Sequence, residues 1–282
     1  MDLSILGYQF MQNAILSTLF GGLACGSIGV FVVLMGLPFI GVAMSHAAFA
    51  GAMLGLWLGF NPLVGAFAAS FIAAAIIGPL ADRGELAPDT SVGIIFSLML
   101  GLAFLFMGLM PGTKSGALEI LWGSILTNTR SDVLLLGIVA AVVVGLVIAF
   151  YKEFQATIFH RDTAIAVGIP ATAIFYGILF LTGATVTASL RPIGGLLVFS
   201  LILNPAAAAY QLTYSMKRMF LLSAAFAVLS GWVGLLLSYL LDIPSGATIV
   251  ITSSVIFLIA NAFSPKKRVK HWQKPPLLEE KQ

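Results

Sequence analysis

The sequence predicts an all-α membrane protein, a polytopic bundle of about eight or nine transmembrane helices. Of its 282 residues, 60% are hydrophobic and only 9% are charged, whereas a soluble domain carries about 25% charged residues. The apolar runs are also too long and continuous for the alternating segments of about ten residues that build a membrane β-barrel. The chain is therefore expected to be a multi-pass protein of the cell membrane (plasma or inner).

The apolar runs divide the chain into nine expected spans, because one span needs about 20 apolar residues. In order, the spans are 14–36, 40–60, 62–81, 90–111, 132–151, 168–189, 193–213, 219–240 and 246–263. Only the tight turn at Asn61-Pro62 separates the second span from the third, so eight remains an alternative count.

The charges divide the chain into a transmembrane domain, residues 1–264, and a basic tail, residues 265–282. The tail holds six of the 14 Lys and Arg residues, and the rest of the chain has eight basic against nine acidic residues. The positive-inside rule then places the tail and the C-terminus in the cytoplasm. A solvated tail explains this charge better than a nucleic-acid partner does.

Several classes of activity lack their motifs. The chain has no Walker A sequence, no His-Glu-x-x-His and no cysteine pair, since Cys25 is its single cysteine. Ser45 and His46 are neighbours, so on a helix they point about 100° apart and make a poor nucleophile–base pair. We therefore expect no enzyme and no cofactor bound by this chain. Few charges lie at membrane depth to drive a proton- or sodium-coupled carrier.

The stretch Gly41–Gly51 holds the only histidine of the apolar body, His46. Ala43, Ala47 and Gly51 are spaced four apart, which gives a helix one thin face for close packing. A histidine in lipid is costly, so His46 is expected to face protein or water. It is a candidate for a transport pathway, with Ser45 beside it; a buried histidine bonded between helices is the alternative.

The largest cytoplasmic connection, Tyr151–Pro170, predicts a short helix over Thr163–Val167. Asp162 is its expected N-cap, Gly168 its C-terminal stop, and Pro170 the start of the next span. Such a helix across the membrane face suits a partner protein; an interfacial helix without a partner is the alternative.

Two further stretches are candidates for the pathway or its entrance. Ala117–Leu126 is apolar but too short to span, so it predicts a re-entrant or interfacial helix, or a loop anchored by Trp122. Pro205 predicts a kinked or broken helix. Asn204 before it either bonds across helices or lines a pathway.

These residues carry a resemblance to the ABC-3 family, the membrane permeases of ABC importers for manganese, zinc or iron, over roughly residues 14–263. The second span matches the family pattern at Gly41, Ser45, His46 and Gly51. The family's loop motif resembles the segment from Ile158-Phe159-His160 through Ala164 to Gly168. The run Gly194–Ala209 and the segment Asp89–Ile94 are also similar to the family.

The resemblance implies a homodimer around a central pathway. Two ATPase subunits, which bind the ATP, would dock on a coupling loop, and a solute-binding protein would deliver a divalent metal ion as cargo. The implied coupling residues are Phe159, His160, Arg161, Asp162, Ala164 and Gly168. His46, Ser45 and Asn204 would belong to the pathway, with His46 as a metal ligand.

The sequence departs from the family at that ligand. The family places an Asp four residues before the histidine, and here that position is Val42; His160 likewise replaces an Asp, and Asn204 an apolar residue. Loss of the carboxylate favours zinc slightly over manganese, and two His46 side chains of a dimer are an alternative ligand pair. Rival functions are an ABC permease for an organic or chelated cargo, and a stand-alone secondary carrier.

Overall fold

A computed structural model of the chain describes residues 7–83, 87–111, 120, 123 and 125–266. Within these ranges every regular element is a helix. Nine of the helices are long and apolar: α1 (Gln9–Leu34), α2 (Ile40–Leu58), α3 (Pro62–Arg83), α4 (Pro88–Leu109), α6 (Arg130–Ala149), α9 (Ala171–Ile193), α10 (Gly195–Leu212), α11 (Met216–Leu241) and α12 (Ser245–Ala262). Three short elements are η2 (Ile125–Thr127), α7 (Tyr151–Phe159) and α8 (Arg161–Ala166).

The expected helical bundle is confirmed, and each of the nine expected spans overlaps one long helix, with ends that differ by up to five residues. Eight helices of the described chain are long and apolar enough to cross a membrane. The exception is α10, in which the apolar helix counted is Leu197–Leu212, shorter than each of the other eight. The count of eight therefore separates full-length spans from one shorter apolar helix.

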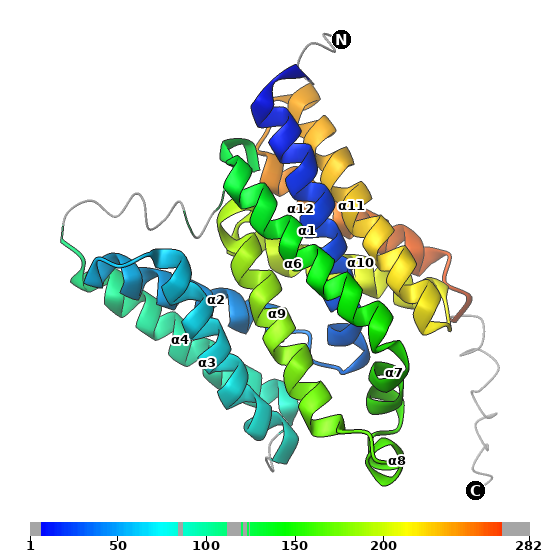
Figure 1. Ribbon diagram of the computed structural model, residues 1–282. Coiled ribbons are helices and arrows are strands. Elements are labelled where there is room, and N and C mark those ends of the chain that lie inside the picture. Colours follow the sequence, from blue (N-terminus) through cyan, green and yellow to red (C-terminus); the bar gives the residue numbers. More distant parts are fainter. Residues whose placement is uncertain (1–6, 84–86, 112–119, 121–122, 124, 267–282) are drawn as a thin grey trace, which may run out of the picture.

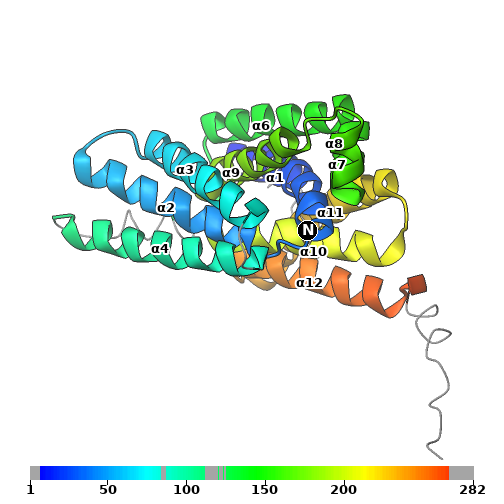
Figure 2. The same ribbon diagram turned by 90° about the horizontal axis from the view of Figure 1, so that it is seen from below.

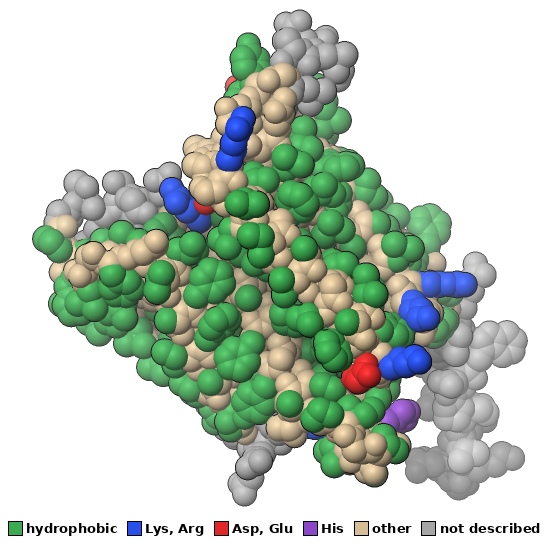
Figure 3. All heavy atoms as spheres, in the orientation of Figure 1, with side chains coloured by type: hydrophobic (Ala, Val, Ile, Leu, Met, Phe, Trp, Pro, Cys, Tyr) green, Lys and Arg blue, Asp and Glu red, His purple; other side chains and the backbone are tan. Residues whose placement is uncertain are grey.

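The bundle is built around α1, which lies between α6 and α11 (Figure 1). Seen from below, α4 and α12 follow one side of the bundle and α6 the other (Figure 2). In the membrane-spanning windows, 72% of the residues of α1 and α2 are buried, against 22% for α4 and α12 and 28% for α6. The first two helices therefore form the core, and the other three present apolar side chains outward. Figure 3 shows the apolar surface on the side of α6.

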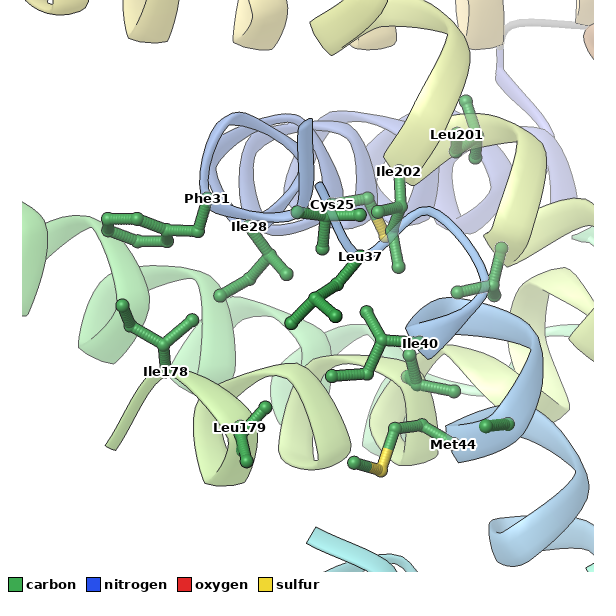
Figure 4. Packing of buried hydrophobic residues seen from close by; sticks show 14 of the residues in the cluster. Cys25, Ile28, Phe31, Leu37, Ile40, Met44, Ile178, Leu179, Leu201 and Ile202 are labelled. Atoms are coloured by element: carbon green, nitrogen blue, oxygen red, sulfur yellow. The ribbon is translucent and has the colours of Figure 1, made fainter. Parts of the chain in front are cut away.

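The core joins four elements that are distant in the sequence. Ile28 and Phe31 of α1 point toward Ile178 of α9, while Ile40 of α2 and Ile202 of α10 complete the cluster (Figure 4). All of these side chains are nearly inaccessible to solvent. Burial of this apolar surface between α1, α2, α9 and α10 fixes the position of α2, the helix that carries His46.

Close helix contacts occur where the sequence offers no side chain. A Cβ atom at Gly51 of α2 would overlap the carbonyl oxygen of Gly65 in α3, and one at Gly29 of α1 would overlap the carbonyl oxygen of Ile202 in α10. The thin face predicted from Gly51 is thus confirmed. Small residues allow this approach, which gives dispersion contacts between backbones where lipid offers no hydrophobic driving force.

The connection between α9 and α10 lies inside the bundle. Pro192, Ile193 and Gly194 are buried, and Ile193 contacts the position of Gly21, which is 12 residues or about 18 Å from the start of α1. Gly194 has φ +98°, a conformation that favours glycine. The α10 helix therefore begins inside the bundle.

The close contact between α2 and α3 makes a testable prediction. Gly51→Ala adds a methyl group against the Gly65 backbone, so we expect a loss of about 1–3 kcal/mol of stability from overpacking. Thermal unfolding of the purified protein in detergent measures it. Gly101→Ala in α4 is the matched control, because a Cβ there meets nothing within 4 Å, and it should leave the transition unchanged or raise it. Equal transitions for both variants would contradict the predicted contact.

Candidate transport site and coupling segment

His46 lies on the partly exposed side of α2, between its own helix and α4. Its Nδ1 is 2.9 Å from the carbonyl oxygen of Val42, and its ring meets the edge of Phe96 at a centroid distance of 4.8 Å. Because a carbonyl can only accept, Nδ1 carries the proton in this arrangement, and Nε2 keeps the lone pair. The side chain is neither fully buried nor bonded between two helices.

Nε2 of His46 is the ring nitrogen that remains available to bind a cation here. Nε2 of a histidine held through Nδ1 is a usual ligand geometry for a divalent transition metal. No cluster of three or more His, Cys, Asp or Glu side chains that could hold a metal occurs in the part of the chain that the structure describes. His46 therefore belongs to no such group among the described residues.

Ser45 and Asn204 were predicted as pathway residues together with His46, and both bond between helices. The Ser45 hydroxyl donates to the carbonyl oxygens of Gly41 (2.8 Å) and Gly195 (3.2 Å), and the side chain is buried. The Asn204 amide is 3.0 Å from the hydroxyls of Ser253 and of Ser254, both in α12. Their contribution to a pathway stays a prediction.

The structure does not bring Asn204 beside His46. Ser45 contacts Gly195, and Gly41 contacts Phe199, so α10 runs from the level of His46 toward the start of α2. Asn204 is nine residues after Gly195, about 13 Å farther along that helix. The two candidate residues therefore lie at different depths.

A cavity of about 350 Å³ opens beside the end of α9, at its junction with α10. Its polar lining consists of Asn61, Thr127, Asn128, Asp132, Thr187 and Arg191. Asp132 is the carboxylate among these residues, and it accepts from the backbone N–H and the hydroxyl of Thr129, at 3.0 and 2.6 Å. The Thr129 hydroxyl in turn accepts from the Asp132 backbone N–H. These bonds form a capping box at the start of α6, in which the Asp132 carboxylate is already hydrogen-bonded to Thr129.

Asn128 ties this region to two helices, and the sequence analysis missed it. Its side-chain amide nitrogen donates to the Ser17 hydroxyl at 2.9 Å and to the Pro192 carbonyl at 3.3 Å. Its backbone carbonyl accepts from the Asn13 side chain at 2.8 Å. Pro192 belongs to the last turn of α9, whose carbonyls have no partner within the helix. A buried asparagine before an α6 cap was the available signal, but its partners are 64 to 115 residues away. Most of the preceding stretch Ala117–Leu126, with Trp122, lies outside the described residues.

The predicted coupling loop forms two short helices, α7 and α8, at one end of the bundle (Figure 1). Ala164 is the buried contact of α8, and Arg161 donates to the Thr172 hydroxyl at 3.3 Å and stands 5.4 Å from the centre of the Phe175 ring. Phe159, His160 and Asp162 are exposed. One side of the segment is thus fixed to α9 and the other is open to a partner.

Two details of this loop differ from the expectation. The helix α8 starts at Arg161, not at Thr163, and the Asp162 cap is wrong because Asp162 lies within the first turn; His160 is the N-cap residue and makes no side-chain cap bond. Its non-helical backbone (φ −145°, ψ 66°) ends α7, and α8 starts at the next residue. The stop at Gly168, with φ +85°, is confirmed, as is the start of α9 after Pro170.

Comparison with known proteins decides the family. The model of the ABC 3 transport family matches residues 7–264, almost the entire membrane domain. The chain belongs to this family. It is accordingly the permease, which is the membrane-spanning subunit of an ABC transporter.

Relatives of this ABC 3 permease include proteins named for manganese and iron. It is 31% identical to the manganese transport system membrane protein MntC of Listeria monocytogenes, over 98% of each chain. It is 33% identical to a Haemophilus influenzae protein named "Probable iron transport system membrane protein", over 92% of each. The solved structure of PsaBC from Streptococcus pneumoniae in complex with Fab superposes with a TM-score of 0.84 at 29% identity, covering 96% of this chain and 98% of that one. The expected permease fold is confirmed.

The Asn128 contacts in this ABC 3 permease lead to a prediction about stability. Asn128→Ala removes the donors to Ser17 and Pro192 and leaves a buried carbonyl without its partner, so we expect a cost of about 1–3 kcal/mol. Leu126→Ala, at an exposed position nearby, is the control. Thermal unfolding in detergent should separate the two variants. A larger decrease in the unfolding temperature for Leu126→Ala than for Asn128→Ala would contradict the predicted stabilisation by the Asn128 amide.

Proposed function

We propose that this chain is the permease of an ABC importer for a divalent transition metal ion, with Mn²⁺ as the first candidate cargo. The observation that carries the proposal is the 31% identity to a manganese permease over 98% of both chains. Relatives named for iron make Fe²⁺ the second candidate. Zn²⁺, which the missing carboxylate at Val42 favoured, is the third.

The pathway is proposed to pass His46 at an interface between two copies of the permease. Support comes from the partly exposed surface around His46, which also includes Val42, Phe96 and Phe199. Two imidazoles related by a twofold axis would supply two nitrogen ligands without any carboxylate. Such a pair would form a site between two copies, which is consistent with the absence of a metal-binding cluster within the described part of one chain.

The α7–α8 segment is proposed to receive the ATPase subunit on the cytoplasmic side, with the C-terminal tail on the same side. The open surface of α8 presents Ile165 (52% exposed) and Val167 (69% exposed). An apolar pair on a helix that is fixed to α9 through Arg161 suits a docking partner that transmits movement. A solute-binding protein would deliver the ion at the opposite face.

An ABC permease for a chelated metal is the alternative cargo class. The cavity at the α9–α10 junction, about 350 Å³, is the feature that favours it, because that volume lies within the range of small-molecule sites. Transport would then depend on the chelator and not on His46.

Uptake by vesicles tests the role of His46. With the ATPase and the binding protein present, His46→Ala should reduce ATP-dependent Mn²⁺ uptake by about tenfold or more, since changes at metal ligands and their supports typically cost 10–100-fold. Basal ATPase activity should be retained, which shows that the complex is assembled. Uptake of Zn²⁺ and Fe²⁺ by the wild type, measured in parallel, identifies the cargo.

Undiminished uptake in His46→Ala would make His46 a packing residue and overturn its proposed role as a ligand. Uptake of none of the three metals by the wild type, together with uptake of a chelate, would overturn the metal-ion proposal in favour of the alternative.

Docking on α8 is tested by co-purification with the ATPase. Ile165→Ser removes an exposed apolar contact without disturbing the buried Ala164, so the permease should fold and retain much less ATPase. Phe263→Ser, at the exposed end of α12 (78% exposed), serves as the control and should retain the ATPase. Loss of ATPase from both variants, or from neither, would sink the assignment of α8 as the docking helix.

A further inference from the structure

A second groove lies at the α7–α8 end of the molecule, outside the transport site and the surface of α8. Its volume is about 570 Å³, and it separates α7 from the connection between α10 and α11. The lining residues are Tyr151, Lys152, Gln155, Phe159, Tyr214, Ser215, Met216 and Lys217. We call it the α7–α11 groove. The proposed pathway does not use it; of the residues assigned above to ATPase coupling, it includes Phe159, at the end of α7.

The charge of the α7–α11 groove is positive. Lys152 lines one wall and Lys217 the other, and no acidic residue is among the lining residues; Glu153 is on α7 but does not line the groove. Figure 3 shows Lys and Arg side chains gathered at this end of the molecule. Two ammonium groups facing one concave space, with hydroxyl and amide groups beside them, form a suitable surface for a phosphate group.

The lysine on α11 is held in place at the groove. The backbone N–H of Lys217 donates to the Tyr151 side chain, and the Lys217 Nζ stands 5.3 Å from the centre of the same ring. A cation over an aromatic face is attracted to it. Tyr151 therefore connects α7 to the start of α11 and orients one of the two cations.

The position of the groove favours a lipid as the source of the phosphate. It lies where the apolar helices α10 and α11 end and start, and Tyr151 and Tyr214 are residues that typically occupy the membrane–water boundary. Phe159 and Tyr214 are 50% and 71% exposed, which gives the groove an exposed aromatic rim. Basic residues at such a boundary attract anionic lipids.

We propose that the α7–α11 groove binds the phosphate headgroup of an anionic phospholipid, with Lys152 and Lys217 as the cationic contacts. A lipid there would touch both the start of α7 and the start of α11. The proposal depends on the membrane location of the chain and not on the identity of its cargo.

Titration of the purified full-length permease in detergent with dioctanoyl phosphatidylglycerol tests this site, with dioctanoyl phosphatidylcholine as the neutral lipid. Each lysine near a membrane surface strengthens anionic lipid binding by about fivefold. Lys152→Gln and Lys217→Gln should therefore each weaken phosphatidylglycerol binding about fivefold, and the double variant more. Arg218→Gln is the matched control, because Arg218 is exposed beside Lys217 but does not line the groove.

Three results would overturn the proposal. The first is equal weakening by Arg218→Gln and Lys217→Gln, which indicates general surface charge. The second is competition by inorganic phosphate at the same concentration as the lipid, which makes free phosphate the ligand. The third is unchanged lipid binding in the double variant together with loss of the ATPase on co-purification, which makes the groove a protein contact. Both lysines are exposed, so the variants should fold; an unchanged thermal transition confirms it.

Discussion

The constraint on which the rest of the bundle depends is the break between α9 and α10 inside the protein. Backbone groups freed at a helix end in an apolar interior must find partners within the protein. Here Asn128 donates to the Pro192 carbonyl and the Gly194 N–H returns to the Leu190 carbonyl at 2.9 Å, both in the last turn of α9. Ser45 adds a bond from α2 to the Gly195 carbonyl in the first turn of α10. These bonds come from three separate parts of the chain. The break thus fixes α2, α6 and α9 against one another.

Close packing at small residues also fixes the positions of these helices. The α2 helix is held on one side by Gly51 against Gly65 and on another by Ser45 against the start of α10. His46 lies between these two contacts in the sequence, so its position on the partly exposed surface follows from the fixing of its helix. The same packing leaves α4 and α12 with few buried residues, and these helices provide surface for lipid or for a second copy.

The sequence predicted the features that depend on local composition and missed those that depend on distant partners. Apolar runs located all nine long helices, and Gly168 and Pro170 marked a real boundary, because these signals act within a few residues. The depth of the α9–α10 break did not follow from hydropathy, since both sides of it are equally apolar. Asn128 was missed because its partners are remote in the sequence. The Asp162 cap failed because the helix already starts at Arg161, with His160 as its N-cap residue, two residues before the expected cap.

The replacement of the family carboxylate by Val42 bears on how this permease treats its cargo. The only group that Val42 offers to His46 is its backbone carbonyl, and Nδ1 occupies it. A pair of unit charges 4 Å apart near a protein surface is worth about 4 kcal/mol, which corresponds to about a thousandfold in affinity. A divalent ion beside lone imidazoles lacks that contribution and is released more readily. On the pathway proposed past His46, the ion would be held weakly, and the choice of metal would rest with the component that delivers it.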